Sequence, residues 1–135
     1  MQKNFVTVEQ AKLLKELGFD QYCDHVYNSE GTFHITNILS FDYRERNNYY
    51  GAPTLSQVQE WLRVEKNVLI YPYPDSNYGE DINGIIIHYL TDIWDYELWI
   101  NGKDETPCNS CRFTNPREAL LNGIDEWIKK QPKLK

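Results

Sequence analysis

Three segments of this sequence carry a helix start signal followed by apolar residues at helical spacing, and they divide the chain into alternating blocks. Thr7, Thr54 and Asn115 each stand directly before such a run, and the third residue after each of them is Gln or Glu. A Ser, Thr or Asn side chain caps the exposed N–H groups of a helix's first turn, and Gln or Glu at that spacing completes a capping box. The pattern therefore predicts helices over residues 8–17, 55–66 and 116–130.

The segments between these helices are rich in aromatic and β-branched residues, which is typical of strands. Strands are predicted over residues 22–27, 32–39, 68–73, 82–90 and 94–101. A turn at 28–31 joins the first two strands, and a hairpin around Thr91-Asp92-Ile93 joins the last two. Residues 41–51 and 74–81 are polar, or contain Pro and Gly, and we expect loops there.

The resulting order, α-β-β-α-β-β-β-α, predicts an α+β fold with a mainly antiparallel sheet and helices packed on a face of it. The length of 135 residues is that of one domain, which we expect to span residues 1–135. The helices should contribute their apolar positions to the core: Leu14, Leu17, Leu55, Val58, Leu62, Ile124, Trp127 and Ile128.

The charge of the chain is concentrated. The formal net charge is −6, and residues 75–105 hold eight acidic residues against one lysine. A protein that binds nucleic acid directly needs a basic footprint, which is absent, so direct nucleic-acid binding is not expected. The acidic stretch is either solvated strand ends and loops or a docking face for a basic partner protein.

Period-2 alternation places Asp95, Glu97 and Trp99 on one side of the last predicted strand. An exposed Trp beside carboxylates would suit a basic partner, because the ring supplies contact area and the acids supply steering. The alternative is that a helix covers Trp99 and the two acids only solvate the strand end. In the docking interpretation these three residues form the binding site.

Two groups of Cys and His side chains could bind a metal ion. Cys23, His25 and His34 would come together if the turn at 28–31 sets His25 opposite His34, whereas a three-residue turn closed by a Gly31 bulge would set Val26 there instead. Cys108 and Cys111 have the spacing of half a zinc site but lack a second pair of ligands. We expect neither a structural zinc nor any cofactor.

Further carboxylates, Asp92, Asp95 and Glu97, could hold Mg²⁺ as in a metal-dependent hydrolase. Such an enzyme would also want basic residues to hold its substrate, and Lys103 alone is nearby. No Gly-rich phosphate loop or nucleophile elbow occurs. We assign no catalytic residue and do not expect an enzyme.

The stretch from Tyr50 to Gln57, with Trp61-Leu62-Arg63, resembles a segment of small uncharacterised proteins encoded by phages and prophages of gut Bacteroidetes. Those proteins are also similar in an opening helix that ends Leu-Gly-Phe, here Leu17-Gly18-Phe19, and in a closing helix that begins near Glu118-Ala119-Leu120. The resemblance implies a phage gene product that works in a bacterial host, and it supplies no activity or catalytic residue.

These observations together predict a non-enzymatic accessory module that binds a host or phage protein, with a basic partner expected. The alternatives are a small metal-dependent hydrolase and an acidic decoy that imitates DNA. The longest apolar run is far shorter than the roughly 20 residues that span a bilayer, so no membrane association is expected. Three cysteines, an odd and low number, favour reduced thiols and a place in the cytoplasm.

Overall fold

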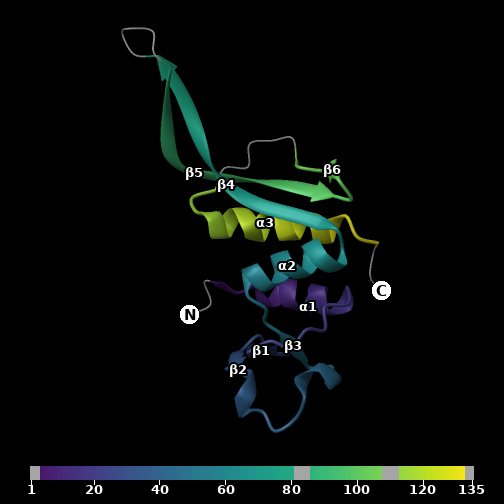
Figure 1. The fold of residues 1–135 in the computed structure, drawn as a ribbon. Helices are drawn as coiled ribbons and strands as arrows, with labels where there is room; N and C mark the ends of the chain where they lie inside the picture. The colour runs from purple at the N-terminus through teal and green to yellow at the C-terminus, as the bar shows by residue number, and fades with distance from the viewer. Residues whose placement is uncertain (1–3, 81–85, 108–112, 133–135) are drawn as a thin grey trace. The chain divides into compact units, whose positions relative to one another are not determined.

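A computed structural model describes residues 4–80, 86–107 and 113–132, and the side chains of residues 75–80 and 86–93 are outside this description. Figure 1 shows the elements. In chain order they are α1 (Val8–Glu16), β1 (His25–Asn28), β2 (Phe33–Ile35), the 3₁₀ turns η2 (Thr36–Ile38) and η3 (Tyr43–Glu45), β3 (Tyr49–Gly51), α2 (Leu55–Glu65), β4 (Val68–Glu80), β5 (Ile86–Ile100), β6 (Lys103–Asp104) and α3 (Pro116–Lys129).

The α+β class and the antiparallel pairing are confirmed, but the described strands form two sheets and not the one sheet that was predicted. One sheet has the order β2-β1-β3 and the other the order β4-β5-β6. The chain divides into two compact units: unit 1 holds residues up to Trp61 together with those from Ile128, and unit 2 holds Leu62–Trp127. A single domain over residues 1–135 stays a prediction, which one cooperative unfolding transition would support.

In unit 1, α1 begins as its sequence predicts. The Thr7 side chain accepts a hydrogen bond from the N–H of Gln10 at 3.2 Å, and the Gln10 side chain accepts one from the N–H of Thr7 at 3.2 Å. Both orphan donors at the helix start are thereby satisfied. Gly18, with φ of +100°, follows the last turn in a backbone conformation that favours glycine.

The predicted loop over residues 41–51 is partly wrong, because it contains η3 and β3. Tyr50 of β3 pairs with Tyr27 of β1 in an antiparallel ladder. A three-residue strand has too few positions to show a period, so the alternation that reveals longer strands could not reveal this one.

In unit 2, β5 runs without interruption through the residues predicted to form a hairpin. Pro74 pairs with Trp94 and Ser76 pairs with Leu90, so one β4 residue lies opposite Thr91-Asp92-Ile93 of β5. Residues 91–93 form a β-bulge, and the chain does not reverse direction there. The predicted loop over residues 74–81 is likewise wrong as far as Glu80, since β4 extends to that residue.

The inner face of the β4–β5 hairpin is covered by α3 (Figure 1). Val68, Ile70, Tyr96 and Leu98 are each at most 2% exposed on this face. A Cβ atom added to Gly123 would lie only 2.5 Å from Cγ2 of Ile70, so the helix approaches the strand closely at this residue. Because successive side chains of a strand point to opposite sides, the residues between these four point away from α3.

The predicted helix boundaries agree with the structure within one residue, and most of the predicted core positions are buried. Leu17 and Ile128 are half-buried; the remaining six are buried, namely Leu14, Leu55, Val58, Leu62, Ile124 and Trp127.

Candidate functional site

The face of the β4–β5 hairpin opposite α3 brings the three predicted binding residues together. Asp95, Glu97 and Trp99 occupy alternate positions of β5, on the other side from Tyr96 and Leu98. Their cross-strand partners on β4 belong to the same side, because residues directly opposite one another share a face. We call this set the outer face: Leu69, Tyr71, Tyr73, Asp95, Glu97 and Trp99.

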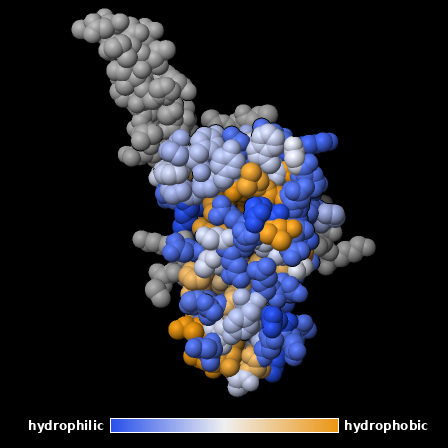
Figure 2. Space-filling model, viewed as in Figure 1, coloured by the Kyte–Doolittle hydropathy of each residue, from blue (hydrophilic) through white to orange (hydrophobic). Residues whose placement is uncertain are grey.

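The outer face is accessible over much of its area. Leu69 is 43% exposed and Tyr71 is 38% exposed, while Asp95, Glu97 and Trp99 are half-buried. In Figure 2, pale side chains, the colour of Tyr and Trp on this hydropathy scale, gather where Figure 1 draws β4 and β5. Aromatic rings that keep part of their surface in water are the side chains most enriched at protein interfaces.

Glu97 holds two of these rings in place. Its Oε1 accepts a hydrogen bond from the Tyr71 hydroxyl at 2.7 Å and another from Nε1 of Trp99 at 2.8 Å. The hydrogen bond to the Glu97 carboxylate raises the pKa of Tyr71, because it stabilises the protonated phenol. Among the described residues, Oε2 of Glu97 makes no hydrogen bond, so one carboxylate oxygen stays open to a partner.

A third carboxylate joins the outer face from β6. Asp104 pairs with Trp99, and hydrogen bonds from Thr106 lower the pKa of Asp104, which keeps it ionised. Asp95 accepts the N–H of Tyr96 at 2.8 Å. Lys103 pairs with Ile100 and therefore belongs to the opposite side. Three carboxylates thus share this face with the aromatic rings.

The outer face ends in a small cavity of about 240 Å³ beside Trp99. Leu69, Arg63 and Gly102 contribute to its lining. Its geometry depends on the turn between β5 and β6, where Asn101 and Gly102 have φ of +52° and +79°. The N–H of Asn101 donates to the carbonyl of Asn67 at 3.0 Å and fixes that turn against the start of β4.

The sequence did not indicate Leu69, Tyr71 or Tyr73 as members of the site, and it indicated Asp104 only as one acid of the stretch 75–105. The alternation of residues 68–73 already places Leu69, Tyr71 and Tyr73 on one side of a strand. Which side faces a helix, and which strand lies opposite, depends on contacts between distant segments. The side on which Asp104 lies could not have been predicted, since a two-residue strand has no sequence pattern of its own.

The first group of metal candidates does not assemble. Val26 pairs with His34, and His25 pairs with Ile35, so the two histidines lie on opposite sides of the hairpin. The sequence left two registers open, and the structure has the one in which a three-residue turn ends at Gly31 and Val26 lies opposite His34. Gly31 has a φ of +84° there. The Nδ1 atom of His25 is buried and has no hydrogen-bond partner among the described residues.

The described residues contain no group of three His, Cys, Asp or Glu side chains arranged to hold a metal ion. The Cys23, His25 and His34 set therefore makes no metal site in this part of the chain. The side chain of Asp92 lies outside the described residues, so a Mg²⁺ site of Asp92, Asp95 and Glu97 stays a prediction. Cys108 and Cys111 lie outside the described residues.

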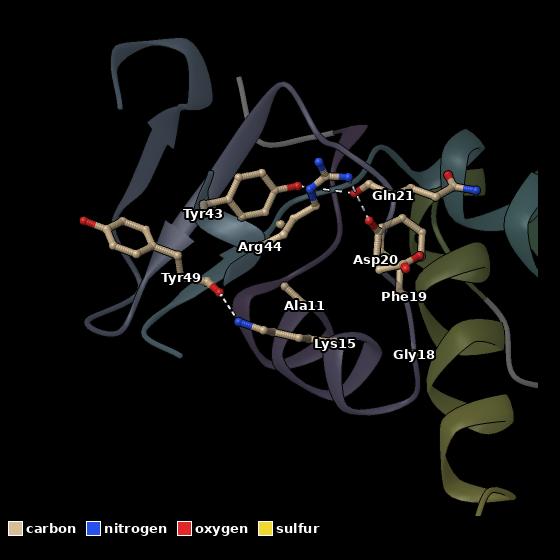
Figure 3. Close-up of a pocket in the computed structure, with 10 residues that line it drawn as sticks. Ala11, Lys15, Gly18, Phe19, Asp20, Gln21, Tyr43, Arg44 and Tyr49 are labelled. Carbon is tan, nitrogen blue, oxygen red and sulfur yellow. Dashed lines mark hydrogen bonds between the residues drawn. The ribbon is translucent and has the colours of Figure 1, made fainter. Parts of the chain in front are cut away.

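Unit 1 contains a larger cavity of about 290 Å³, which we call the Lys15 pocket (Figure 3). Its walls come from the last turn of α1, the chain that follows it, η3 and β3. The lining residues that carry its chemistry are Lys15, Phe19, Asp20, Tyr43, Arg44 and Tyr49.

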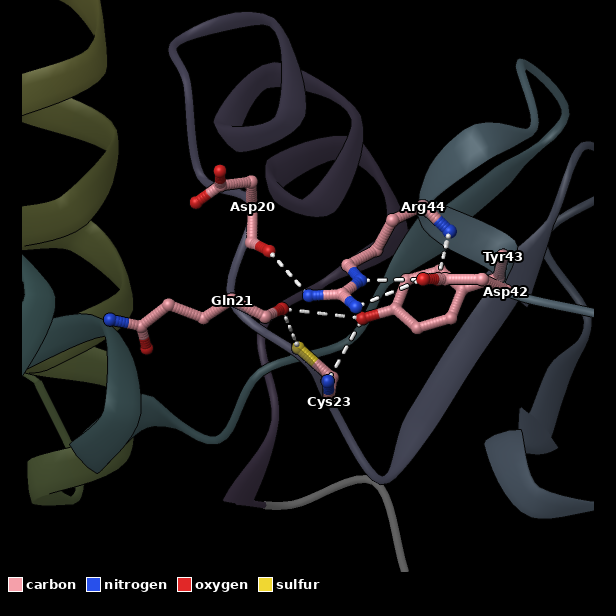
Figure 4. Close-up of polar contacts among 6 residues, drawn as sticks. All are labelled: Asp20, Gln21, Cys23, Asp42, Tyr43 and Arg44. Carbon is pink, nitrogen blue, oxygen red and sulfur yellow. Dashed lines mark hydrogen bonds and ion pairs between the residues drawn. The ribbon is translucent and has the colours of Figure 1, made fainter.

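Tyr43 forms a rigid wall of the Lys15 pocket (Figure 4). Its hydroxyl accepts the N–H of Cys23 at 2.9 Å and donates to the carbonyl of Gln21 at 3.3 Å. Burial is the main cause that raises the pKa of Tyr43 and, to about 11, the pKa of the Cys23 thiol. Both groups are therefore neutral at ordinary pH and serve as structure at this site.

No helix in the described residues combines the length and apolar character needed to cross a lipid bilayer. No protein-family model, curated protein or solved structure matches the chain.

Proposed function

We propose that this protein is a non-enzymatic binding module whose outer face docks a basic partner protein. The observation that carries the proposal is the arrangement around Glu97. One carboxylate oxygen orients the rings of Tyr71 and Trp99, while the other makes no hydrogen bond among the described residues. Rings held in one orientation lose little freedom on binding, which lowers the entropic cost of association.

The charges on the outer face define the partner. Asp95, Glu97 and Asp104 place three carboxylates on the face that carries Trp99, and the whole chain is acidic, with a net charge of −6. A surface of this kind attracts Lys- and Arg-rich segments, and an arginine can also stack on an aromatic ring. The cavity beside Trp99 has room for one aliphatic side chain of the same partner.

The partner is expected to dock on the face of the sheet, because the edge of β4 is partly blocked. Leu98 directs its N–H to Thr106 and its carbonyl to Glu105, and Trp94 exchanges both backbone hydrogen bonds with Phe113. From Trp94 to Ile100, the even-numbered residues of β5 therefore point their N–H and carbonyl groups away from β4. The β4 residues paired with them point their own backbone groups away from β5, toward the free edge of the sheet.

Two of these β4 partners are Pro72 and Pro74, which pair with Tyr96 and Trp94. At these positions a proline removes no hydrogen bond from the β4–β5 ladder. It does remove an N–H from the free edge that an added strand would need, as prolines on edge strands commonly do. Strand addition is disfavoured here, which leaves the side chains of the outer face as the docking surface.

Phage origin and action on a host factor in the bacterial cytoplasm form part of this proposal. Their support is the resemblance of the Tyr50–Gln57 region to phage and prophage proteins and the low cysteine count. An acidic decoy for DNA-binding proteins would also take a basic partner. Aromatic rings at the centre of the outer face favour a protein-docking surface over one that imitates a phosphate backbone.

Selection from a library of random peptides displayed on beads tests the proposal without knowledge of the partner. The wild-type protein is expected to enrich peptides with several Arg or Lys residues and one aliphatic residue. The Glu97→Gln/Trp99→Ala variant should lose this enrichment. Glu16→Gln is the matched control, because it removes the same charge from an exposed site on α1.

Enrichment of neutral or acidic peptides would contradict the proposal, as would equal enrichment by the wild type and the outer-face variant. A decoy for DNA-binding proteins gives a different result. It would select basic peptides without an aliphatic residue, and its selection would survive Trp99→Ala.

A further inference from the structure

The Lys15 pocket contains a positive charge that no carboxylate neutralises. The Lys15 ammonium donates hydrogen bonds to the carbonyls of Tyr49, at 2.7 Å, and of Arg46. Among the described residues no carboxylate forms an ion pair with Lys15. Lys15 is half-buried, and this burial lowers the pKa of its ammonium.

The other charged groups of the pocket do not offset Lys15. Arg44 is paired with Asp42 through an Nη2–Oδ2 distance of 2.9 Å and an Nε–Oδ1 distance of 3.1 Å. The main-chain carbonyl of Asp20 accepts from Nη1 of Arg44 at 3.4 Å, and the Asp20 carboxylate points away from that guanidinium (Figure 4). Lys15 is therefore the cation of the pocket lining that has no carboxylate partner among the described residues.

Two sets of N–H donors remain available to a ligand. An ammonium has three N–H groups and Lys15 uses two of them; a guanidinium has five and Arg44 uses three. Hydrogen bonds from such cationic donors to a carboxylate are about twice as strong as neutral ones. The donors of the Lys15 pocket thus suit an anion.

The walls of the pocket favour an anion that carries a planar apolar group, such as an aromatic ring. Phe19 and Tyr43 are buried, Tyr49 is half-buried, and Ala11 adds an apolar surface on the α1 side. Gly51 lies close behind Tyr43: a Cβ atom at that residue would be 2.9 Å from the Tyr43 hydroxyl. The walls are thus closely packed, and a volume of about 290 Å³ is at the small end of ligand pockets.

We propose that the Lys15 pocket binds a small carboxylic acid with a planar apolar body, its carboxylate paired with Lys15 and its ring set against Phe19 and Tyr43. This site is in unit 1 and is independent of the outer face, so each proposal can fail without the other.

The test is a titration of the full chain with benzoate, followed by the backbone amide NMR signals of Gly18, Phe19 and Gly51. Benzamide, which has the same shape without the charge, is the ligand control. Benzoate is expected to shift these signals in a saturable way at millimolar concentrations, and benzamide is expected to bind about tenfold more weakly or not at all.

The matched variants are Lys15→Gln and Lys12→Gln. Both remove one lysine charge from α1, but Lys12 does not line the pocket. Lys15→Gln is expected to weaken benzoate binding about tenfold or more, whereas Lys12→Gln should change it less than about twofold. Arg44→Gln, which leaves Lys15 in place, should have an intermediate effect.

Absence of saturable shifts with benzoate, or equal shifts with benzamide, would overturn the proposal. Equal losses in the two lysine variants would also overturn it, since the effect would then be one of overall charge. Should Lys15→Gln fail to fold, the comparison of benzoate with benzamide on the wild-type chain decides the question.

Discussion

The indole N–H of Trp99 donates to Oε1 of Glu97 at 2.8 Å, two residues earlier on the same strand. The same oxygen accepts the hydroxyl of Tyr71 from the neighbouring strand. A strand places residues i and i+2 on the same side, so the side chains of Glu97 and Trp99 are neighbours on the outer face and can reach each other. It joins the acidic and aromatic parts of the outer face into one unit.

Glu97→Gln is expected to lower the pKa of Tyr71 toward the ordinary tyrosine value, because the carboxylate that stabilises the protonated phenol is lost. The folded-state pKa is raised in the wild type. The hydrogen bond between Tyr71 and Glu97 therefore stabilises the folded state fully below the pKa of an unfolded tyrosine. This stabilisation is lost as the pH rises through the pKa of Tyr71 in the folded protein. An NMR titration of the Tyr71 ring signals between neutral and strongly alkaline pH measures the shift. An unchanged Tyr71 pKa in the variant would contradict the hydrogen bond.

Reversing charge with Asp95→Lys/Glu97→Lys should leave the protein folded, since partly exposed charges each contribute little to stability. It should abolish binding of the basic peptides that the wild type selects. Thermal unfolding and peptide affinity at low salt are measured together. Unchanged affinity in a folded variant would place the docking surface elsewhere.

Gly123→Ala is expected to destabilise the protein, although the same change in an exposed helix usually stabilises it. The added methyl group would lie 2.5 Å from Ile70 and 3.2 Å from the ring of Tyr96, and both neighbours are buried. The cost of such overpacking is about 1–3 kcal/mol in the free energy of unfolding. Chemical denaturation measures it, with Glu65→Ala at an exposed site of α2 as the control. A gain in stability would mean that α3 is not held this close to β4.

Leu62→Ala should lower the free energy of unfolding by about 2–5 kcal/mol, as truncation of a fully buried side chain does. Leu62 is 0% exposed, whereas Val64 on the same helix is 59% exposed. Val64→Ala is the matched control and should cost less than about 0.5 kcal/mol. A similarly small loss for Leu62→Ala would place this side of α2 outside the core.

Cys23 should react slowly with thiol reagents in the native protein. Cys23 is 2% exposed, and burial raises the pKa of its thiol to about 11, so little of the reactive thiolate forms at pH 8. The rate of reaction with a disulfide reagent is measured in a Cys108→Ser/Cys111→Ser background, before and after denaturation. Equal rates in the two states would contradict the buried position of Cys23.

The sequence predicted the helices well because their signals are local. The capping box of Thr7 and Gln10 involves two residues one turn apart, and the apolar spacing of Leu55, Val58 and Leu62 repeats within a single helix. Interactions of this range form within one helical turn and depend little on the rest of the chain. The common side of Asp95, Glu97 and Trp99 was equally local, since it needs only strand alternation.

Only the tertiary structure decided the features that depend on how one strand pairs with another. The turn residues 28–31 allowed two registers, and only the pairing of Val26 with His34 separated the histidines. Residues 91–93 looked like a turn, but pairing on both sides of them with β4 made them a bulge. Tyr71 met Glu97 for the same reason: a hydrogen-bonded ladder fixes which distant residues face each other, and no property of either segment alone specifies that choice.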